Sequence, residues 1–88
     1  MSKGGARVSK TVTFYTREGC HLCDDALAII EQIRTALPFE LVVRDLDREA
    51  PRDKLAAYDH EVPVVELDGR KIMKYHVDPE RLTRLLTL

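Results

Sequence analysis

The chain has 88 residues, enough for one domain with a single hydrophobic core. Its 14 basic and 15 acidic residues give a formal net charge of -1, which argues against nucleic acid or an anionic membrane as the main partner. Two cysteines are too few for a disulfide scaffold, and no apolar run is long enough to span a membrane. We therefore expect a cytoplasmic protein, acting as a monomer.

The first ten residues differ in composition from the rest. Residues 1–10 hold three basic side chains, no acid and two adjacent glycines. We expect a flexible tail there, followed by one domain over residues 11–88. A mitochondrial targeting segment is the alternative, but the adjacent glycines would make a poor amphipathic helix.

A strand-helix-strand unit follows the tail. Residues 11–16 are predicted to form a central strand, because all of their inner positions are β-branched or aromatic and pack well on both faces of a sheet. Apolar residues at helical spacing predict a helix from Leu22 to Leu37, which Pro38 ends. Residues 39–45 form the next strand. Such a unit places its two strands side by side and parallel, with a right-handed crossover.

The second half of the chain is predicted to contain shorter elements. Residues 45–50 are predicted to be a polar connection, and a short helix should run from Pro51 to about Tyr58. The Asp68-Gly69 pair is typical of a tight hairpin turn.

Asp78 and Pro79 can start the last helix. The whole order is β-α-β-α-β-β-α. It predicts an α/β fold, with a four-stranded mixed sheet and helices on both faces.

Both cysteines, Cys20 and Cys23, fall between the first strand and the first helix. Unpaired N–H groups at a helix start stabilise a thiolate, so the leading cysteine should be nucleophilic. The same spacing also serves half of a zinc site or a static disulfide. Zinc would need two more ligands, and His60 and His76 are distant in sequence. A redox pair, with Cys20 attacking and Cys23 resolving, is the favoured interpretation, and we expect no metal.

From Thr11 to Leu86 the sequence resembles the glutaredoxin branch of the thioredoxin-like proteins. The similarity rests on the cysteine pair after the first strand, on Tyr15-Thr16-Arg17 ahead of it, and on Val62-Pro63 before the hairpin. The resemblance implies that Pro63 is cis and faces the cysteines, and that the Val62 backbone pairs with the substrate. It also implies that Arg17 contacts the carboxylate of glutathione.

Two stretches depart from that family. His21-Leu22 stands where the common glutaredoxin has Pro-Tyr, and Lys74 to Asp78 replaces a Gly-Gly-acid segment that holds glutathione. We therefore expect glutathione to be at most a weakly bound co-substrate, and no other cofactor. The expected partners are a disulfide-containing protein or small thiol, and an upstream reductant, either glutathione or an enzyme of the thioredoxin-reductase type.

Three functions fit these residues. The first is a thiol–disulfide oxidoreductase that reduces protein or mixed disulfides. The second is an iron–sulfur cluster carrier in which Cys20 of two subunits holds the cluster. The third is a redox-regulated interaction module without turnover of its own.

Overall fold

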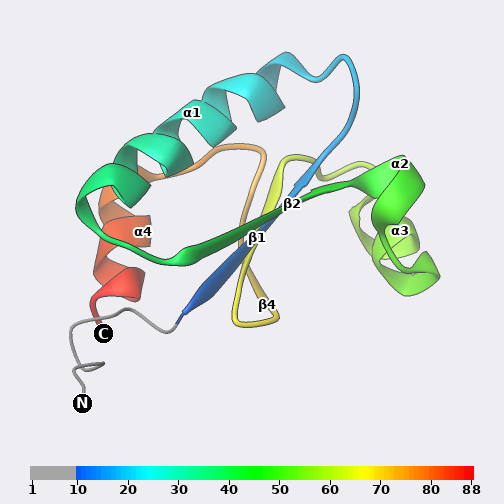
Figure 1. Cartoon of the computed structure of the whole chain (residues 1–88). Coiled ribbons are helices and arrows are strands. Elements are labelled where there is room, and N and C mark those ends of the chain that lie inside the picture. Colours follow the sequence, from blue (N-terminus) through cyan, green and yellow to red (C-terminus); the bar gives the residue numbers. More distant parts are fainter. Residues whose placement is uncertain (1–9) are drawn as a thin grey trace.

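The computed structural model describes residues 10–88 (Figure 1). Of the predicted tail, residues 1–9 lie outside the described part. Lys10 contacts the domain: its carbonyl accepts from the Glu40 N–H at 3.1 Å, and its Nζ donates to the Leu88 carbonyl at 2.9 Å. The elements in chain order are β1 (Thr11–Thr16), α1 (His21–Ala36), β2 (Glu40–Asp45), α2 (Leu46–Glu49), α3 (Arg52–Tyr58), β3 (Val64–Leu67), β4 (Arg70–Lys74) and α4 (Pro79–Leu86).

The four strands form one mixed sheet in the order β2-β1-β3-β4. β1 is central, as predicted; it runs parallel to β2 and antiparallel to β3, while β3 and β4 form the antiparallel hairpin. At the hairpin turn, Asp68 and Gly69 both have positive φ, of 50° and 88°. This is the backbone that a tight primed turn requires, which confirms the turn predicted from these two residues.

Helices cover both faces of the sheet (Figure 1). Phe14 and Val65 face the main core, which α1 and α4 close; Tyr15 and Val64 face a smaller cluster beneath α2 and α3. The division follows from strand geometry, because neighbouring residues point to opposite faces. The predicted α/β fold, with a mixed sheet covered on both sides, is confirmed.

One prediction about the chain was wrong. Residues 45–50, predicted as a polar connection, contain the helical turn α2. The Asp45 carboxylate accepts from the N–H groups of Asp47 and Arg48, and the Glu49 carboxylate accepts from the Asp45 N–H at 2.8 Å. These reciprocal bonds satisfy N–H groups at the helix start. Leu46, fully buried against Tyr15 and its neighbours, fixes the turn to the sheet.

Hydrogen bonds to the buried carboxylate of Glu66 hold α3 against the sheet. Glu66 on β3 is only 4% exposed, and its Oε2 accepts from Lys54 Nζ at 2.6 Å and from the Tyr58 hydroxyl at 2.7 Å. The Tyr58 ring also meets the Tyr15 ring edge to face, with centroids 5.3 Å apart. A buried carboxylate needs such partners, because an unpaired charge in the interior is costly.

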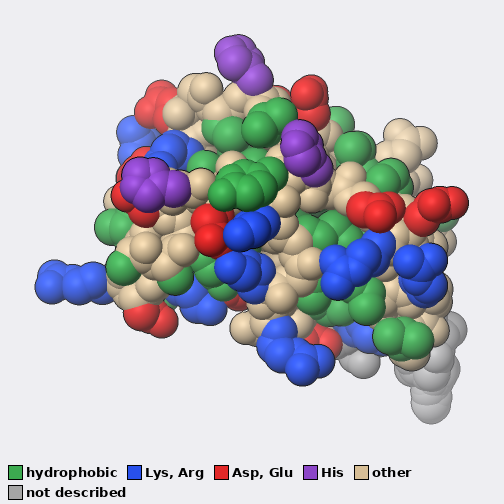
Figure 2. Space-filling view, turned by 180° about the vertical axis from the view of Figure 1, so that it is seen from behind, with side chains coloured by type: hydrophobic (Ala, Val, Ile, Leu, Met, Phe, Trp, Pro, Cys, Tyr) green, Lys and Arg blue, Asp and Glu red, His purple; other side chains and the backbone are tan. Residues whose placement is uncertain are grey.

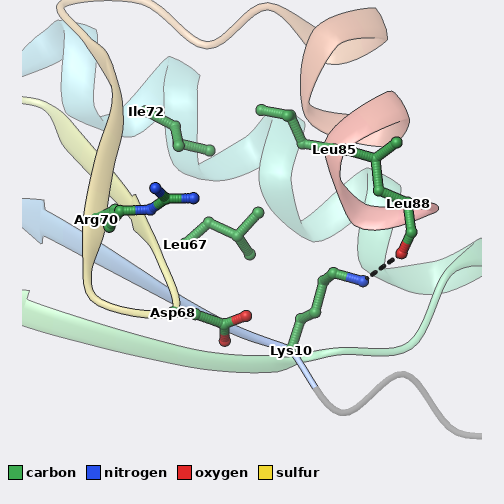
Figure 3. Close-up of a pocket in the computed structure, with 7 residues that line it drawn as sticks. All are labelled: Lys10, Leu67, Asp68, Arg70, Ile72, Leu85 and Leu88. Atoms are coloured by element: carbon green, nitrogen blue, oxygen red, sulfur yellow. Dashed lines mark hydrogen bonds between the residues drawn. The ribbon is translucent and has the colours of Figure 1, made fainter.

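The surface carries both signs of charge, interspersed with hydrophobic side chains (Figure 2). None of the helices in residues 10–88 has the length and apolar character to cross a membrane. A hollow beside the hairpin turn is lined by Leu67, Ile72 and Leu85, with Lys10 bonded to Leu88 at its rim (Figure 3). It lies where β1 begins, at the opposite end of the sheet from the cysteines.

Candidate active site

The cysteines lie at the junction between β1 and α1. β1 ends at Thr16, the chain turns through Gly19 with φ of 79°, and α1 starts at His21. Cys20 is the N-cap of α1, and its Sγ accepts the N–H of Cys23 at 3.1 Å. The two Cα atoms are 5.2 Å apart, and the side chains form a disulfide. The strand-to-helix junction predicted for the pair is confirmed.

The two sulfurs differ in accessibility. Cys23 is 1% exposed and belongs to the main core, whereas Cys20 is half-buried at its border. An incoming molecule therefore meets Cys20 first. The sulfur of Cys20 also lies at the positive end of a 16-residue helix and already accepts a backbone N–H. Both features stabilise a negatively charged sulfur there.

The segment Val62-Pro63, here called the proline loop, lies at the same end of the sheet as the cysteines. Tyr15 of β1 pairs with Val64 of β3, which pairs with Lys74 of β4. In the next row towards that end, Thr16 follows Tyr15, Pro63 precedes Val64 and Tyr75 follows Lys74. These three residues therefore lie at the end of the sheet where residues 17–20, here called the cysteine loop, begin. The Val62–Pro63 bond is cis, as expected from the resemblance, and the Pro63 carbonyl accepts the Tyr75 N–H at 2.8 Å.

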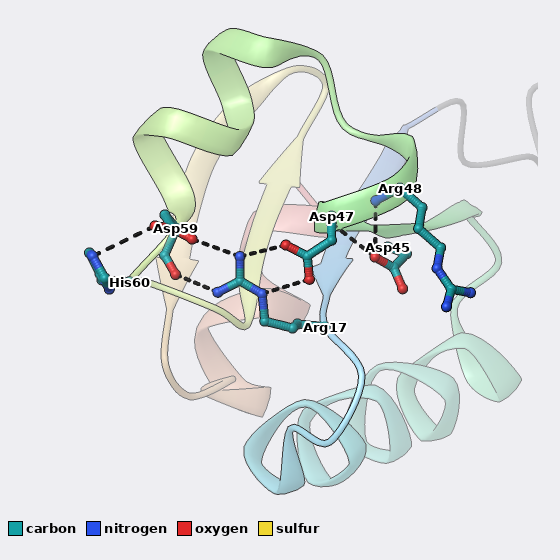
Figure 4. Close-up of polar contacts among 6 residues, drawn as sticks. All are labelled: Arg17, Asp45, Asp47, Arg48, Asp59 and His60. Carbon is teal, nitrogen blue, oxygen red and sulfur yellow. Dashed lines mark hydrogen bonds and ion pairs between the residues drawn. The ribbon is translucent and has the colours of Figure 1, made fainter.

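Arg17 is bonded within the domain (Figure 4). Its Nε and Nη2 donate to the two carboxylate oxygens of Asp47 at 2.9 and 2.8 Å. Its Nη1 donates to the Asp59 carbonyl and its Nη2 to the Asp59 carboxylate, both at 2.7 Å. These bonds raise the pKa of Arg17 above its ordinary value and hold the pKa of Asp47 below its own. Arg17 therefore ties the cysteine loop to α2 and to the segment that leads into Pro63.

Residues 11–87 match the family model described as glutaredoxin-like domain (DUF836). The chain belongs to the glutaredoxin-like domain family. It is 31% identical over 78 residues to the glutaredoxin-like protein YDR286C homolog of Dictyostelium discoideum, a match covering 84% of this chain and 72% of that one. Among solved structures it is similar to target protein XcR50 from X. campestris, with 30% identity, coverage of 86% and 95% of the two chains, and a TM-score of 0.65.

The fold is that of thioredoxins. Mitochondrial thioredoxin 3 from Saccharomyces cerevisiae, in its oxidised form, aligns with a TM-score of 0.68 over 90% of this chain and 77% of its own, at 21% identity. At that identity the likeness concerns the fold alone. Family, fold and the Cys20–Cys23 disulfide together indicate a redox function for this glutaredoxin-like domain.

Sequence reasoning missed two residues that shape the site of the glutaredoxin-like domain. Asp47 and Asp59 hold Arg17, although they lie 30 and 42 positions further along the chain. No local signal could have paired them with Arg17; only the β1-β2 register and the position of α3 bring them together. The expected contact of Arg17 with a glutathione carboxylate remains a prediction, and four of the five guanidinium N–H groups already have acceptors.

Side chains that bind metals are dispersed in the glutaredoxin-like domain. Across residues 10–88, no three His, Cys, Asp or Glu side chains come together in a way that could hold a metal ion. The three histidines, His21, His60 and His76, are all exposed.

Proposed function

We propose that this glutaredoxin-like domain is a thiol–disulfide oxidoreductase in which Cys20 attacks the substrate disulfide and Cys23 resolves the intermediate. The observation that carries this proposal is the asymmetry of the pair: Cys20 caps α1 and reaches the surface, while Cys23 is buried directly behind it. Only the sulfur of Cys20 is accessible to a macromolecular disulfide. The same sulfur has the N–H partner that favours a thiolate.

The exchange runs in two steps. In the first, the Cys20 thiolate attacks one sulfur of the substrate disulfide, a mixed disulfide forms, and the other substrate sulfur leaves as a thiolate. In the second, the Cys23 thiolate attacks the Cys20 sulfur and releases the remaining substrate thiol. Two electrons pass to the substrate, and the Cys20–Cys23 disulfide is the oxidised product.

The oxidised pair must be reduced again before the next turnover. We propose two thiols of glutathione, or the dithiol of a thioredoxin-reductase-type enzyme, as the electron source. Either reductant would first attack the accessible Cys20 sulfur, so the route of reduction reverses the route of oxidation.

Substrate contact is proposed at the proline loop. Val62 is half-buried, precedes the cis Pro63 and contacts both hydrophobic clusters, so its position is fixed from two sides. Within residues 10–88, no hydrogen bond occupies its backbone N–H or carbonyl. These two groups can therefore pair with an extended segment on either side of a substrate cysteine.

The test combines turnover with trapping. The wild type should reduce the disulfides of insulin with dithiothreitol as electron donor, and Cys20→Ser should abolish this activity. Cys23→Ser should accumulate mixed disulfides that a reducing agent releases, whereas Cys20→Ser should accumulate none. Equal trapping by both variants, or insulin reduction that survives Cys20→Ser, would contradict the proposed roles.

A further inference from the structure

A strained turn lies beside Pro63, at the end of the sheet that holds the cysteines. Tyr75 has φ of 70°, and the His76 N–H donates to the Lys74 carbonyl at 2.8 Å, which closes a γ-turn centred on Tyr75. With a positive φ this is the rare form of the γ-turn, and a bulky side chain adopts it at a cost in free energy. Glycine would adopt the same backbone without that cost.

The surroundings hold Tyr75 in this conformation. Its N–H donates to the Pro63 carbonyl at 2.8 Å, so the turn is fastened to the proline loop. The Lys74 ammonium lies 5.3 Å from the centre of the Tyr75 ring, within the range of a cation–π contact. Residues kept in strained conformations by their neighbours cluster at functional sites. The strained backbone therefore marks Tyr75 as a candidate functional residue at the cysteine end of the sheet.

Large hydrophobic side chains are exposed at the end of the sheet that holds the cysteines. Tyr75 is 41% exposed, and Leu22, which lies between the two cysteines in the first turn of α1, is 45% exposed. In the described part of the chain, the other large hydrophobic side chains so exposed are Val43 and Leu88. Two of these four exposed side chains, Leu22 and Tyr75, therefore lie at the end of the sheet that holds the cysteines.

The cationic side chains Arg17 and Lys74, near these residues, are already paired with carboxylates. Arg17 is held by Asp47 and Asp59, and Lys74 lies 3.4 Å from the Glu61 carboxylate while it faces the Tyr75 ring. A small ligand with two carboxylates, such as glutathione, would have to compete for these cations. A polypeptide with an apolar side chain beside its cysteine needs none of them.

We propose that Tyr75 is a specificity-determining residue, whose ring selects disulfides in polypeptide segments with an apolar neighbour over the mixed disulfides of glutathione. This rests on the proposed function, and the exchange chemistry is the one described there. The ring covers the apolar side chain of the substrate while the Val62 backbone holds the chain. The same ring occupies space through which a small charged ligand would approach the backbone of the turn.

The experiment compares Tyr75→Gly and Tyr75→Phe with the wild type. Val43→Ala is the matched control, because it removes a similarly exposed hydrophobic side chain from β2, the edge strand on the opposite side of β1 from β3 and β4. Each protein is assayed for kcat/KM on insulin and on the mixed disulfide of glutathione with mercaptoethanol. Chemical denaturation is followed in parallel; Tyr75→Gly should be at least as stable as the wild type, because glycine relieves the turn.

In Tyr75→Gly, the ratio of kcat/KM for insulin to that for the glutathione substrate should fall about tenfold, mainly through KM for insulin, as expected for the loss of one aromatic contact. Tyr75→Phe and Val43→Ala should keep the ratio within about twofold. An active wild type whose ratio survives Tyr75→Gly would overturn the inference alone. An equal fall in Tyr75→Phe would overturn the assignment to the ring. A wild type that reduces neither substrate would refute the proposed function and the inference with it.

Discussion

The hydroxyl of Tyr58 should contribute measurably to stability, because it bonds a buried carboxylate. Tyr58 is 6% exposed, and its hydroxyl donates to Glu66 Oε2 at 2.7 Å. Tyr58→Phe keeps the ring and its edge contact with Tyr15 but leaves Glu66 with Lys54 as its remaining partner. A hydrogen bond to a charged group contributes about 1.5–3 kcal/mol. For a domain of this size, a loss of about 2 kcal/mol should lower the thermal midpoint by roughly 8–16 °C.

The loss should also depend on pH at the alkaline end. Burial, and next the bond to Glu66, raise the pKa of Tyr58 above 10.0, its ordinary value. The folded state therefore holds this proton more tightly than the unfolded state. The stabilisation is complete below about pH 10 and is lost as the pH rises through the folded-state pKa. The Phe variant lacks this group, so the difference between the two proteins should shrink above about pH 10.

Urea denaturation between neutral and alkaline pH measures both effects. Tyr15→Phe is the matched control at neutral pH: Tyr15 is 4% exposed, but none of the hydrogen bonds among residues 10–88 involves its hydroxyl. It should cost less than Tyr58→Phe. Burial raises the pKa of Tyr15 too, so the alkaline slope of Tyr58→Phe is compared with the wild type alone. A Tyr58→Phe protein within about 0.5 kcal/mol of the wild type, with an unchanged alkaline slope, would refute the account of the Glu66 site.

Two further predictions concern the charged groups that hold the loops. Arg17→Lys keeps the charge but not the planar guanidinium that binds Asp47 and Asp59 together. Amide hydrogen exchange should therefore become several-fold faster in residues 46–49 and 59–63. Unchanged exchange there would show that the arginine does not stabilise these segments. On acidification, the wild type should lose stability as Asp47 and Glu61 take up protons, because hydrogen bonds to Arg17 and Lys71, respectively, hold the pKa of each below its ordinary value. The stabilisation is present above the unfolded-state pKa and is lost as the pH falls through the folded-state pKa. In urea titrations, the free energy of unfolding of Arg17→Lys should therefore fall less steeply with acidification than that of the wild type. The same dependence in both proteins would argue against the Asp47 contribution.

Local signals in the sequence were sufficient to predict much of the fold. The Asp68-Gly69 turn was predictable because few residues accept the backbone that it needs. The position of Cys20 at the start of α1 followed from a change of hydrophobic period, from alternation in residues 11–16 to helical spacing after Leu22. The cis bond at Pro63 followed from the resemblance to glutaredoxins rather than from any feature of the residues themselves.

Features set by distant contacts could not be predicted. α2 contains one buried apolar residue, Leu46, in an otherwise charged stretch, so no hydrophobic period marks it. The pairing of Arg17 depends on residues brought close only by the folded sheet. The positive φ of Tyr75 contradicts the preference of an aromatic residue and exists because Pro63 and Lys74 accept the N–H groups of the turn. In each case tertiary contacts decided against local propensity.

The different roles of the two cysteines can be measured most directly by alkylation of the reduced protein. Iodoacetamide is added at mildly acidic pH, and mass spectrometry of peptides follows the modification of Cys20 and Cys23 with time. Cys20 should react first and Cys23 only slowly, because Cys20 is accessible at the start of α1 and Cys23 is 1% exposed. Earlier modification of Cys23, or equal rates at both positions, would contradict the assignment of Cys20 as the attacking thiol.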